Sequence, residues 1–148
     1  MKRWIVLFCL MVFVLTGCSN EKNTVSDAPR IEDYSWVMTT IQYTEDDGQI
    51  IAHAADTVGV PDSSVEIALK CSSANGELSL TDETNSKSYK GTYKVTDTNQ
   101  ETRIYEIVLN NMEGMAVVSM TNYEDQSQTP TFIIRFEDYS INFFSAEK

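Results

Sequence analysis

The strongest constraint on the fold is a series of short segments in which apolar and polar residues alternate, beginning at Tyr34. In residues 102–109, for example, Tyr105, Ile107 and Leu109 lie two positions apart. Side chains two apart share one face of a β-strand, so each segment presents an apolar face and a polar face. Turn residues such as Asn75-Gly76 separate the segments and favour tight hairpins. The pattern therefore predicts an antiparallel sheet built from consecutive hairpins.

Eight or nine strands can be assigned in this way. They are expected at residues 34–43, 49–52, 65–72, 77–81, 88–96, 102–109, 115–123, 131–137 and 140–144. Consecutive hairpins need no crossover, and closing the sheet removes its exposed edges. We therefore expect an all-β protein, an antiparallel meander closing into a small barrel or a strongly curled sheet. Gly91, inside a strand, is expected to mark a bend or a close approach of two backbones.

Several local expectations accompany this assignment. In the first strand, Trp36 and Met38 share one face and Ile41 belongs to the other. Residues 53–62 break the alternation, which indicates a short helix over residues 52–58 or an irregular segment after the second strand. Residues 45–48 and 110–114 are expected to be turns, and residues 124–130 a polar loop.

The beginning of the chain has a different character. Lys2 and Arg3 precede an apolar run over residues 4–16, which Gly17 and Cys18 follow. The run is about 13 residues long, whereas a membrane-spanning helix needs roughly 20. A positive start, a short apolar stretch and a small-residue exit are typical of a cleaved secretory signal.

The residues Leu15, Thr16, Gly17 and Cys18 resemble the lipobox of bacterial lipoprotein signal peptides. The resemblance implies that residues 1–17 are removed and that Cys18 carries a diacylglyceryl lipid, which holds the protein on the extracytoplasmic face of the cell membrane. Two or more acyl chains suffice for stable attachment. Residues 18–33 are polar and without periodicity, so we expect a lipidated N-terminus and flexible tether before a β domain over residues 34–148.

Charge and cysteine content narrow the possible partners. The leader holds two basic residues and no acid, so the remainder keeps all 22 acidic residues against 9 basic ones, a net charge of −13. This excess argues against nucleic acid and against electrostatic docking on an anionic membrane. If Cys18 is lipidated, Cys71 lacks a disulfide partner. Its position among alternating apolar residues favours a buried core thiol over a reactive one.

Catalytic and metal-binding patterns are weak in this sequence. His53 is the one histidine, which excludes a multi-histidine zinc site, and no nucleophile elbow or phosphate-binding glycine loop accompanies it. The acidic run at residues 45–47 is explained by the turn that Asp47-Gly48 predicts. We therefore expect no enzyme activity, no cofactor and no metal site.

The aromatic residues suggest a binding site. Trp36, Tyr89, Tyr93 and Tyr105 are expected on inward faces, where they either fill the barrel or line a pocket for an amphipathic ligand. The polar tether, the Tyr34 and Trp36 strand, the broken segment after the second strand and Gly91-Thr92-Tyr93 resemble the small lipocalin-like lipoproteins of Gram-positive bacteria. That resemblance implies a calycin-type barrel, in some members with an apolar ligand in its mouth.

The sequence thus predicts a monomeric, membrane-anchored, non-enzymatic binding module for a small apolar or amphipathic molecule. The alternative is a module that binds a protein or polymer of the cell envelope through its outer surface. An internal cavity favours the first hypothesis, and an exposed apolar patch favours the second.

Overall fold

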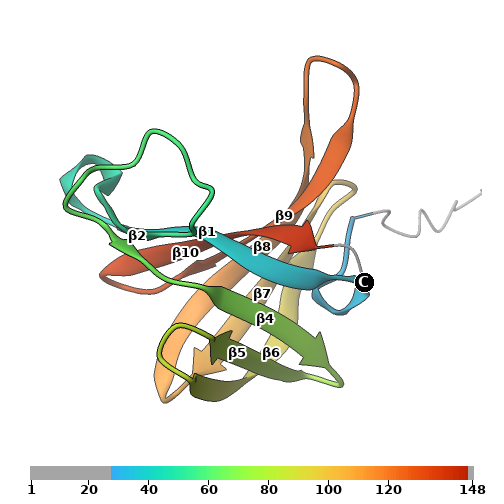
Figure 1. The fold of residues 1–148 in the computed structure, drawn as a ribbon. Helices are drawn as coiled ribbons and strands as arrows, with labels where there is room; N and C mark the ends of the chain where they lie inside the picture. The colour runs from blue at the N-terminus through green and yellow to red at the C-terminus, as the bar shows by residue number, and fades with distance from the viewer. Residues whose placement is uncertain (1–27, 147–148) are drawn as a thin grey trace, which may run out of the picture.

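The computed structural model describes residues 28–146, and this part of the chain consists of β-strands joined by short turns (Figure 1). The elements are η1 (Ile31–Asp33), β1 (Ser35–Tyr43), η2 (Asp46–Gly48), β2 (Ile50–His53), β3 (Val65–Glu66), β4 (Leu69–Ala74), β5 (Glu77–Asp82), β6 (Lys87–Thr98), β7 (Thr102–Leu109), β8 (Met112–Asn122), β9 (Gln128–Arg135) and β10 (Tyr139–Ala146). No helix in the described region is long and apolar enough to cross a membrane.

Eight strands form a closed antiparallel barrel, as the alternation predicts. β4 to β10 follow one another in space in chain order, and β1 lies between β10 and β4. The β1–β10 ladder, from Ser35 opposite Ala146 to Tyr43 opposite Tyr139, completes the closure. β2 and β3 are additional strands that extend the sheet from β1. The sequence was compatible with either a closed barrel or a curled sheet, and the structure is a closed barrel.

A β-bulge at Thr39 divides β1 into two halves. Met38 is paired with Phe143 and Thr40 with Asn142, which leaves Thr39 as the extra residue. The first half of β1 pairs with β4 and the second half with β2. Because the bulge shifts the alternation by one position, Ile41 is directed inward together with Trp36 and Met38. The expectation that Ile41 lies on the opposite face is therefore wrong.

The irregular segment after β2 contains no helix. Residues 54–64 form turns and bends, so the irregular alternative is confirmed. The bulge holds this segment, because the carbonyl of Thr39 accepts hydrogen bonds from the amide of Ala54 and the hydroxyl of Thr57. The strand expected over residues 65–72 is split into β3, which pairs in parallel with β2, and β4. Val65 is consequently 60% exposed rather than inward.

Two hairpins show how turn chemistry sets the register. Asn75 and Gly76 have positive φ angles of 54° and 81° and connect β4 to β5, as predicted. Asn110 and Asn111, with φ of 50° and 66°, form a two-residue turn between β7 and β8, so the turn is shorter than the expected 110–114. A two-residue hairpin of type I′ needs positive φ at both central positions, and asparagine tolerates that conformation.

Gly91 and Gly114 lie within strands where neighbouring backbone comes close. A Cβ on Gly91 would lie 2.2 Å from the carbonyl oxygen of Val108, and one on Gly114 would lie 2.7 Å from that of Arg135. This confirms the close approach expected at Gly91.

The polar loop expected over residues 124–130 is shorter in the structure, because β9 begins at Gln128 rather than at residue 131.

The N-terminal segment closes one end of the barrel. The side chains of Ile31 and Trp36 are completely buried, and Ala28 is 4% exposed. The backbone amide of Ile31 donates to the hydroxyl of Tyr105 at 3.0 Å, and the indole of Trp36 donates to the carbonyl of Ile31 at 2.9 Å. Residues 28–33, which the sequence assigns to the tether, are thus packed as part of the barrel domain. We call this the closed end.

Candidate functional site

The opposite end of the barrel contains a pocket of about 370 Å³, which we call the mouth. Its wall comes from the last residues of β1, β5 and β7, the first residues of β4, β6, β8 and β10, and residues in or beside β2 and β3. The lining residues are Ile41, Ile51, Ile67, Leu69, Leu80, Asp82, Tyr89, Leu109, Asn110, Met112, Tyr139 and Ile141. Apolar side chains predominate, as is usual for small-molecule sites.

The local backbone explains why apolar side chains gather here. The bulge in β1 turns Ile41 inward, and a second irregularity between β1 and β2 leaves Ile51 outside the paired register. Ile67 lies in the break between β3 and β4, where its amide donates to the carbonyl of His53. Irregular backbone thus adds apolar residues at the rim of a regular barrel, which widens the mouth relative to the closed end.

Asp82 is the charged residue of the lining, and its side chain is largely buried, with the residue 7% exposed. Its two carboxylate oxygens accept hydrogen bonds from the side-chain amide of Asn85 at 2.8 Å and from the backbone amide of Asn85 at 2.9 Å. These bonds, and more weakly the charge of Lys87, hold the pKa of Asp82 below its usual value despite desolvation. The mouth therefore contains an ionised carboxylate at neutral pH.

Two tyrosines provide further polar atoms in the mouth. Tyr89 and Tyr139 are both half-buried, and the hydroxyl of Tyr139 donates to the sulfur of Met112 at 3.5 Å. Burial raises the pKa of Tyr139, and the nearby Asp138 and Tyr89 add to the effect. The phenol of Tyr139 therefore stays neutral at physiological pH, and both tyrosines present hydroxyl groups beside apolar surface.

The four aromatic residues expected at the ligand site are divided between two environments. Trp36 and Tyr105 are fully buried in the core at the closed end, and Tyr93 packs edge-on against Tyr105 at 5.7 Å between ring centroids. Tyr89 lines the mouth. Three other residues of the mouth were not expected at a ligand site from the sequence: Asp82, Tyr139 and Ile67. Asp82 and Tyr139 lie at strand ends, where a polar residue is ordinarily read as part of a turn.

Leu15, Thr16, Gly17 and Cys18, the residues that resemble a lipobox, lie outside the described residues. The described chain enters the domain at Ala28, next to the closed end, where Arg103 donates a hydrogen bond to the carbonyl of Ala28. Any segment that precedes Ala28 therefore joins the domain at the end opposite the mouth.

His53 has a partner that its neighbours in sequence do not indicate. Its Nδ1 lies 2.9 Å from the hydroxyl oxygen of Ser64, across the irregular segment. The Ser64 hydroxyl also donates to the carbonyl of Pro61 at 2.6 Å. Because a hydroxyl has one proton to donate, Ser64 is the acceptor in its contact with His53. A histidine that donates to a serine does not activate it as a nucleophile, so this pair fastens residues 54–64.

Cys71 is buried on the inward face of β4, opposite Trp36 in β1, as the alternation predicts. Burial raises the pKa of its thiol to about 12. The thiolate is the reactive form of cysteine, so this side chain is inert at neutral pH. Within residues 28–146, no group of three histidine, cysteine or acidic residues is placed to hold a metal ion.

Two larger hollows lie on the outer wall, along β6. One, of about 710 Å³, is lined by residues of β4 to β6, and the other, of about 540 Å³, by residues of β6, β7 and the turn that follows β7. Serine, threonine, asparagine and lysine contribute much of their lining. The mouth is smaller but its apolar, inward-facing lining makes it the better candidate for a ligand site.

Comparison of the chain with protein-family models, with curated protein sequences and with solved structures found no significant match. The geometry of the mouth is therefore the main indication of function.

Proposed function

We propose that this protein is a lipid-anchored module on the extracytoplasmic face of the cell membrane, and that it binds a small apolar or amphipathic molecule in the mouth of its barrel. The observation that carries the proposal is the unequal filling of the interior. Large side chains fill the closed end, whereas the mouth has a pocket of about 370 Å³. Small-molecule pockets have volumes of roughly 300 to 1,000 Å³.

The arrangement of the two ends suits an anchored receptor. The resemblance to a lipobox implies a lipid attachment site at Cys18, and the described domain starts at Ala28 beside the closed end. A tether attached there leaves the mouth accessible to solutes. The net charge of −13 for the chain without its leader makes the lipid, rather than the domain surface, the means of membrane attachment.

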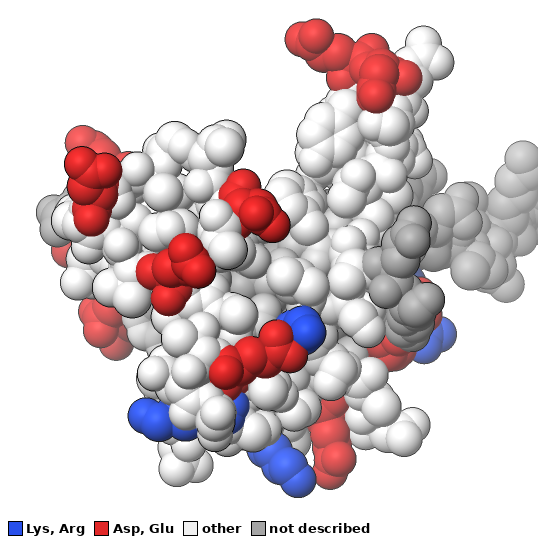
Figure 2. All heavy atoms as spheres, viewed as in Figure 1, with Lys and Arg blue, Asp and Glu red and all other residues white. Residues whose placement is uncertain are grey.

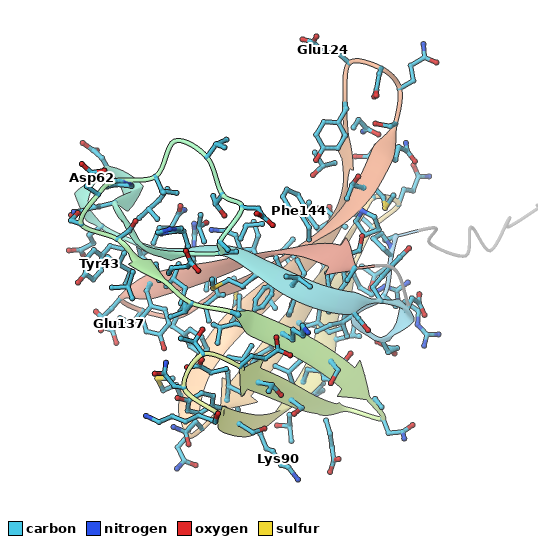
Figure 3. The ribbon with its side chains drawn as sticks, in the orientation of Figure 1. Tyr43, Asp62, Lys90, Glu124, Glu137 and Phe144 are labelled. Carbon is cyan, nitrogen blue, oxygen red and sulfur yellow. The ribbon has the colours of Figure 1, made fainter. Side chains whose placement is uncertain are left out.

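A second candidate function is binding of a protein or polymer through the outer wall. Val37 on β1 and Phe144 on β10 are directly opposite each other and are 37% and 42% exposed. Ile133 on the adjacent β9 is 39% exposed. Figure 3 shows Phe144 between the β8–β9 hairpin and the irregular segment after β2. This apolar strip crosses three strands, and exposed apolar surface of this kind is typical of interaction sites.

The ligand proposal is tested with residues 19–148, which include the whole barrel and its core. The probe is N-phenyl-1-naphthylamine, an apolar dye that is neutral at pH 7 and fluoresces in apolar surroundings. We expect saturable binding to the wild type. In the variant Ile51→Trp, the indole occupies the mouth, so affinity should fall at least about tenfold.

The matched control is Val108→Trp, which adds the same side chain on the outer wall of β7, where Val108 is 36% exposed. It should bind the dye like the wild type. Equal binding by all three proteins would place the dye on the outer surface, and absence of saturable binding to the wild type would refute the ligand proposal.

The anchor is tested in the full chain, expressed in a bacterium fed an alkyne analogue of palmitate. The wild type should be labelled and sediment with membranes, and Cys18→Ser should be unlabelled. Cys9→Ser, within the proposed leader, is the matched control and should retain the label. Labelling of Cys18→Ser would contradict the proposed attachment site.

A further inference from the structure

The mouth contains a charge that its apolar lining does not explain. Ten of the twelve lining residues are aliphatic, methionine or tyrosine, and the other two are Asp82 and Asn110. Burial of a carboxylate is costly unless the group is paired or hydrogen-bonded. Asp82 is nevertheless 7% exposed and ionised, and no lysine or arginine is among the residues that line the mouth.

Asp82 has a structural role that leaves part of its capacity unused. Its two hydrogen bonds from Asn85, together with an interaction with the backbone amide of Thr84, hold the β5–β6 turn. A carboxylate offers about four acceptor positions, so these contacts leave room for a further donor. Asparagine or serine at this position would also accept a bond from the turn amide without placing a charge in the pocket. The turn therefore accounts for a polar residue here, but it does not require a negative one.

Charges of both signs lie around the mouth. Lys87 faces Asp82 across the β5–β6 ladder and partly offsets its charge, but Lys87 is exposed and does not line the pocket. Lys70 pairs with Glu83 at 2.7 Å. On the opposite side, Asp138 lies close enough to raise the pKa of Tyr139, and Glu137 precedes it in the β9–β10 turn. In Figure 3, Glu137 and Tyr43 project at the end of the barrel where β10 begins, and Figure 2 shows acidic groups over that side of the molecule.

The remaining polar atoms of the mouth suit a cation. Tyr89 and Tyr139 present aromatic rings, whose faces attract ammonium groups. The side chain of Asn110 contributes a carbonyl acceptor. Donors fixed for an anion, such as a guanidinium or a lysine ammonium, are not among the lining residues.

We propose that the mouth selects organic cations, namely amphipathic molecules with an ammonium group that pairs with Asp82 and an aliphatic body that lies against Ile41, Ile67 and Ile141. This inference depends on the proposed function, because it assigns a charge to the ligand of the same pocket. A fatty acid, which has the same body and the opposite charge, is excluded by the same arrangement.

The test compares three ligands of equal chain length, octylammonium, octanol and octanoate, by isothermal titration calorimetry on residues 19–148. Measurements are made at pH 7 and 150 mM salt, where long-range attraction to the acidic surface is screened. We expect octylammonium to bind at least about tenfold more tightly than octanol, since a hydrogen bond between two charged groups is stronger than one to a neutral hydroxyl. Octanoate should bind most weakly.

Two variants of equal net charge locate the effect. Asp82→Asn should bring the affinity for octylammonium to within about threefold of that for octanol. Glu124→Gln removes a charge from the tip of the β8–β9 hairpin, far from the mouth in Figure 3, and should leave the preference unchanged. Asn110→Asp adds a carboxylate to the mouth and should strengthen the preference, which provides a test even if Asp82→Asn fails to fold.

The outcomes separate the two proposals. If octylammonium is preferred and Asp82→Asn abolishes the preference, the inference is supported. If all three ligands bind equally, or octanoate binds best, selection of cations is refuted while a ligand pocket remains. If none of the three binds and the naphthylamine dye does not bind either, the proposed function fails.

Discussion

The two ends of the barrel interior are made from the same strands but have opposite properties. At the closed end, Trp36, Tyr105, Phe132 and Phe143 are completely or almost completely buried, and Phe132 lies between Trp36 and Phe143 at centroid distances of 5.2 and 5.1 Å. At the mouth, the tyrosines Tyr89 and Tyr139 are half-buried around a pocket. We infer that the closed end supplies most of the stability of the fold and the mouth supplies its binding capacity.

Titratable groups follow the same division. The closed end raises the pKa of Cys71 and of Tyr105 by burial and thus keeps both neutral. The mouth lowers the pKa of Asp82 through hydrogen bonds and thus keeps it charged. A packed interior excludes charge, whereas a pocket that faces solvent tolerates a carboxylate once the protein supplies donors.

The largest expected difference between the two ends comes from truncating one aromatic side chain at each end to alanine. Trp36→Ala should lower the free energy of unfolding by about 3–5 kcal/mol, because the cavity left at the closed end cannot collapse completely. Tyr89→Ala, at the mouth, should cost about 1 kcal/mol or less, since its side chain is already half-exposed. Urea denaturation followed by circular dichroism measures both. If Trp36→Ala does not fold, Trp36→Phe replaces it, and equal losses at the two ends would contradict the division.

A finer comparison removes one hydroxyl from each end. Tyr105→Phe leaves the buried amide of Ile31 without its acceptor, and an unsatisfied buried donor costs about 1–3 kcal/mol. Tyr139→Phe loses a 3.5 Å contact with the sulfur of Met112 and should change the unfolding free energy by less than about 0.5 kcal/mol. The same denaturation assay applies. A comparable cost for Tyr139→Phe would show that the rim contributes to stability as the closed end does.

The closed end was easier to predict from sequence than the mouth. Alternation places Tyr105 and Ile107 inward because their strand is regular, and the structure buries both. At the mouth the alternation fails, since the bulge at Thr39 reverses the direction of Ile41. A bulge depends on cross-strand pairing between residues distant in sequence, so a local pattern does not reveal it.

The N-terminal segment is a second place where the local sequence pattern does not reveal contacts between distant residues. Residues 28–33 lack periodicity, and their composition resembles that of a tether. Ile31 is nevertheless completely buried, because the hydroxyl of Tyr105 and the indole of Trp36 satisfy its backbone groups. These partners lie on β7 and β1, which are distant in sequence. The burial of Ile31 therefore depends on the closed barrel and is not indicated by the residues next to it.

The alkaline stability of the protein should depend on the closed end. The unfolded Cys71 thiol ionises near pH 8.5, whereas in the folded protein its pKa is about 12. The folded state therefore keeps a proton that the unfolded state loses, and stability is fully present below pH 8.5 and falls as pH rises toward 12. This group should remove about 2 kcal/mol of unfolding free energy between pH 8 and pH 10. Cys71→Ala should show a shallower decline over that range in urea denaturation, and an unchanged slope would exclude the buried thiol as its source.

The smallest expected effect concerns the segment that borders the mouth. His53→Ala removes the 2.9 Å contact with Ser64 across residues 54–64, a loss of about 1 kcal/mol for a partly exposed pair. Ser64→Ala should have a similar effect, and the double variant should cost little more than either single one, because both remove the same bond. Amide exchange locates the change: the amides of Ala54 and Ile67, which bond to Thr39 and His53, should exchange faster, while that of Ile107 at the centre of β7 should not change. Faster exchange at Ile107 would mean that the pair stabilises the whole barrel, and the mouth would then contribute to stability as well as to binding.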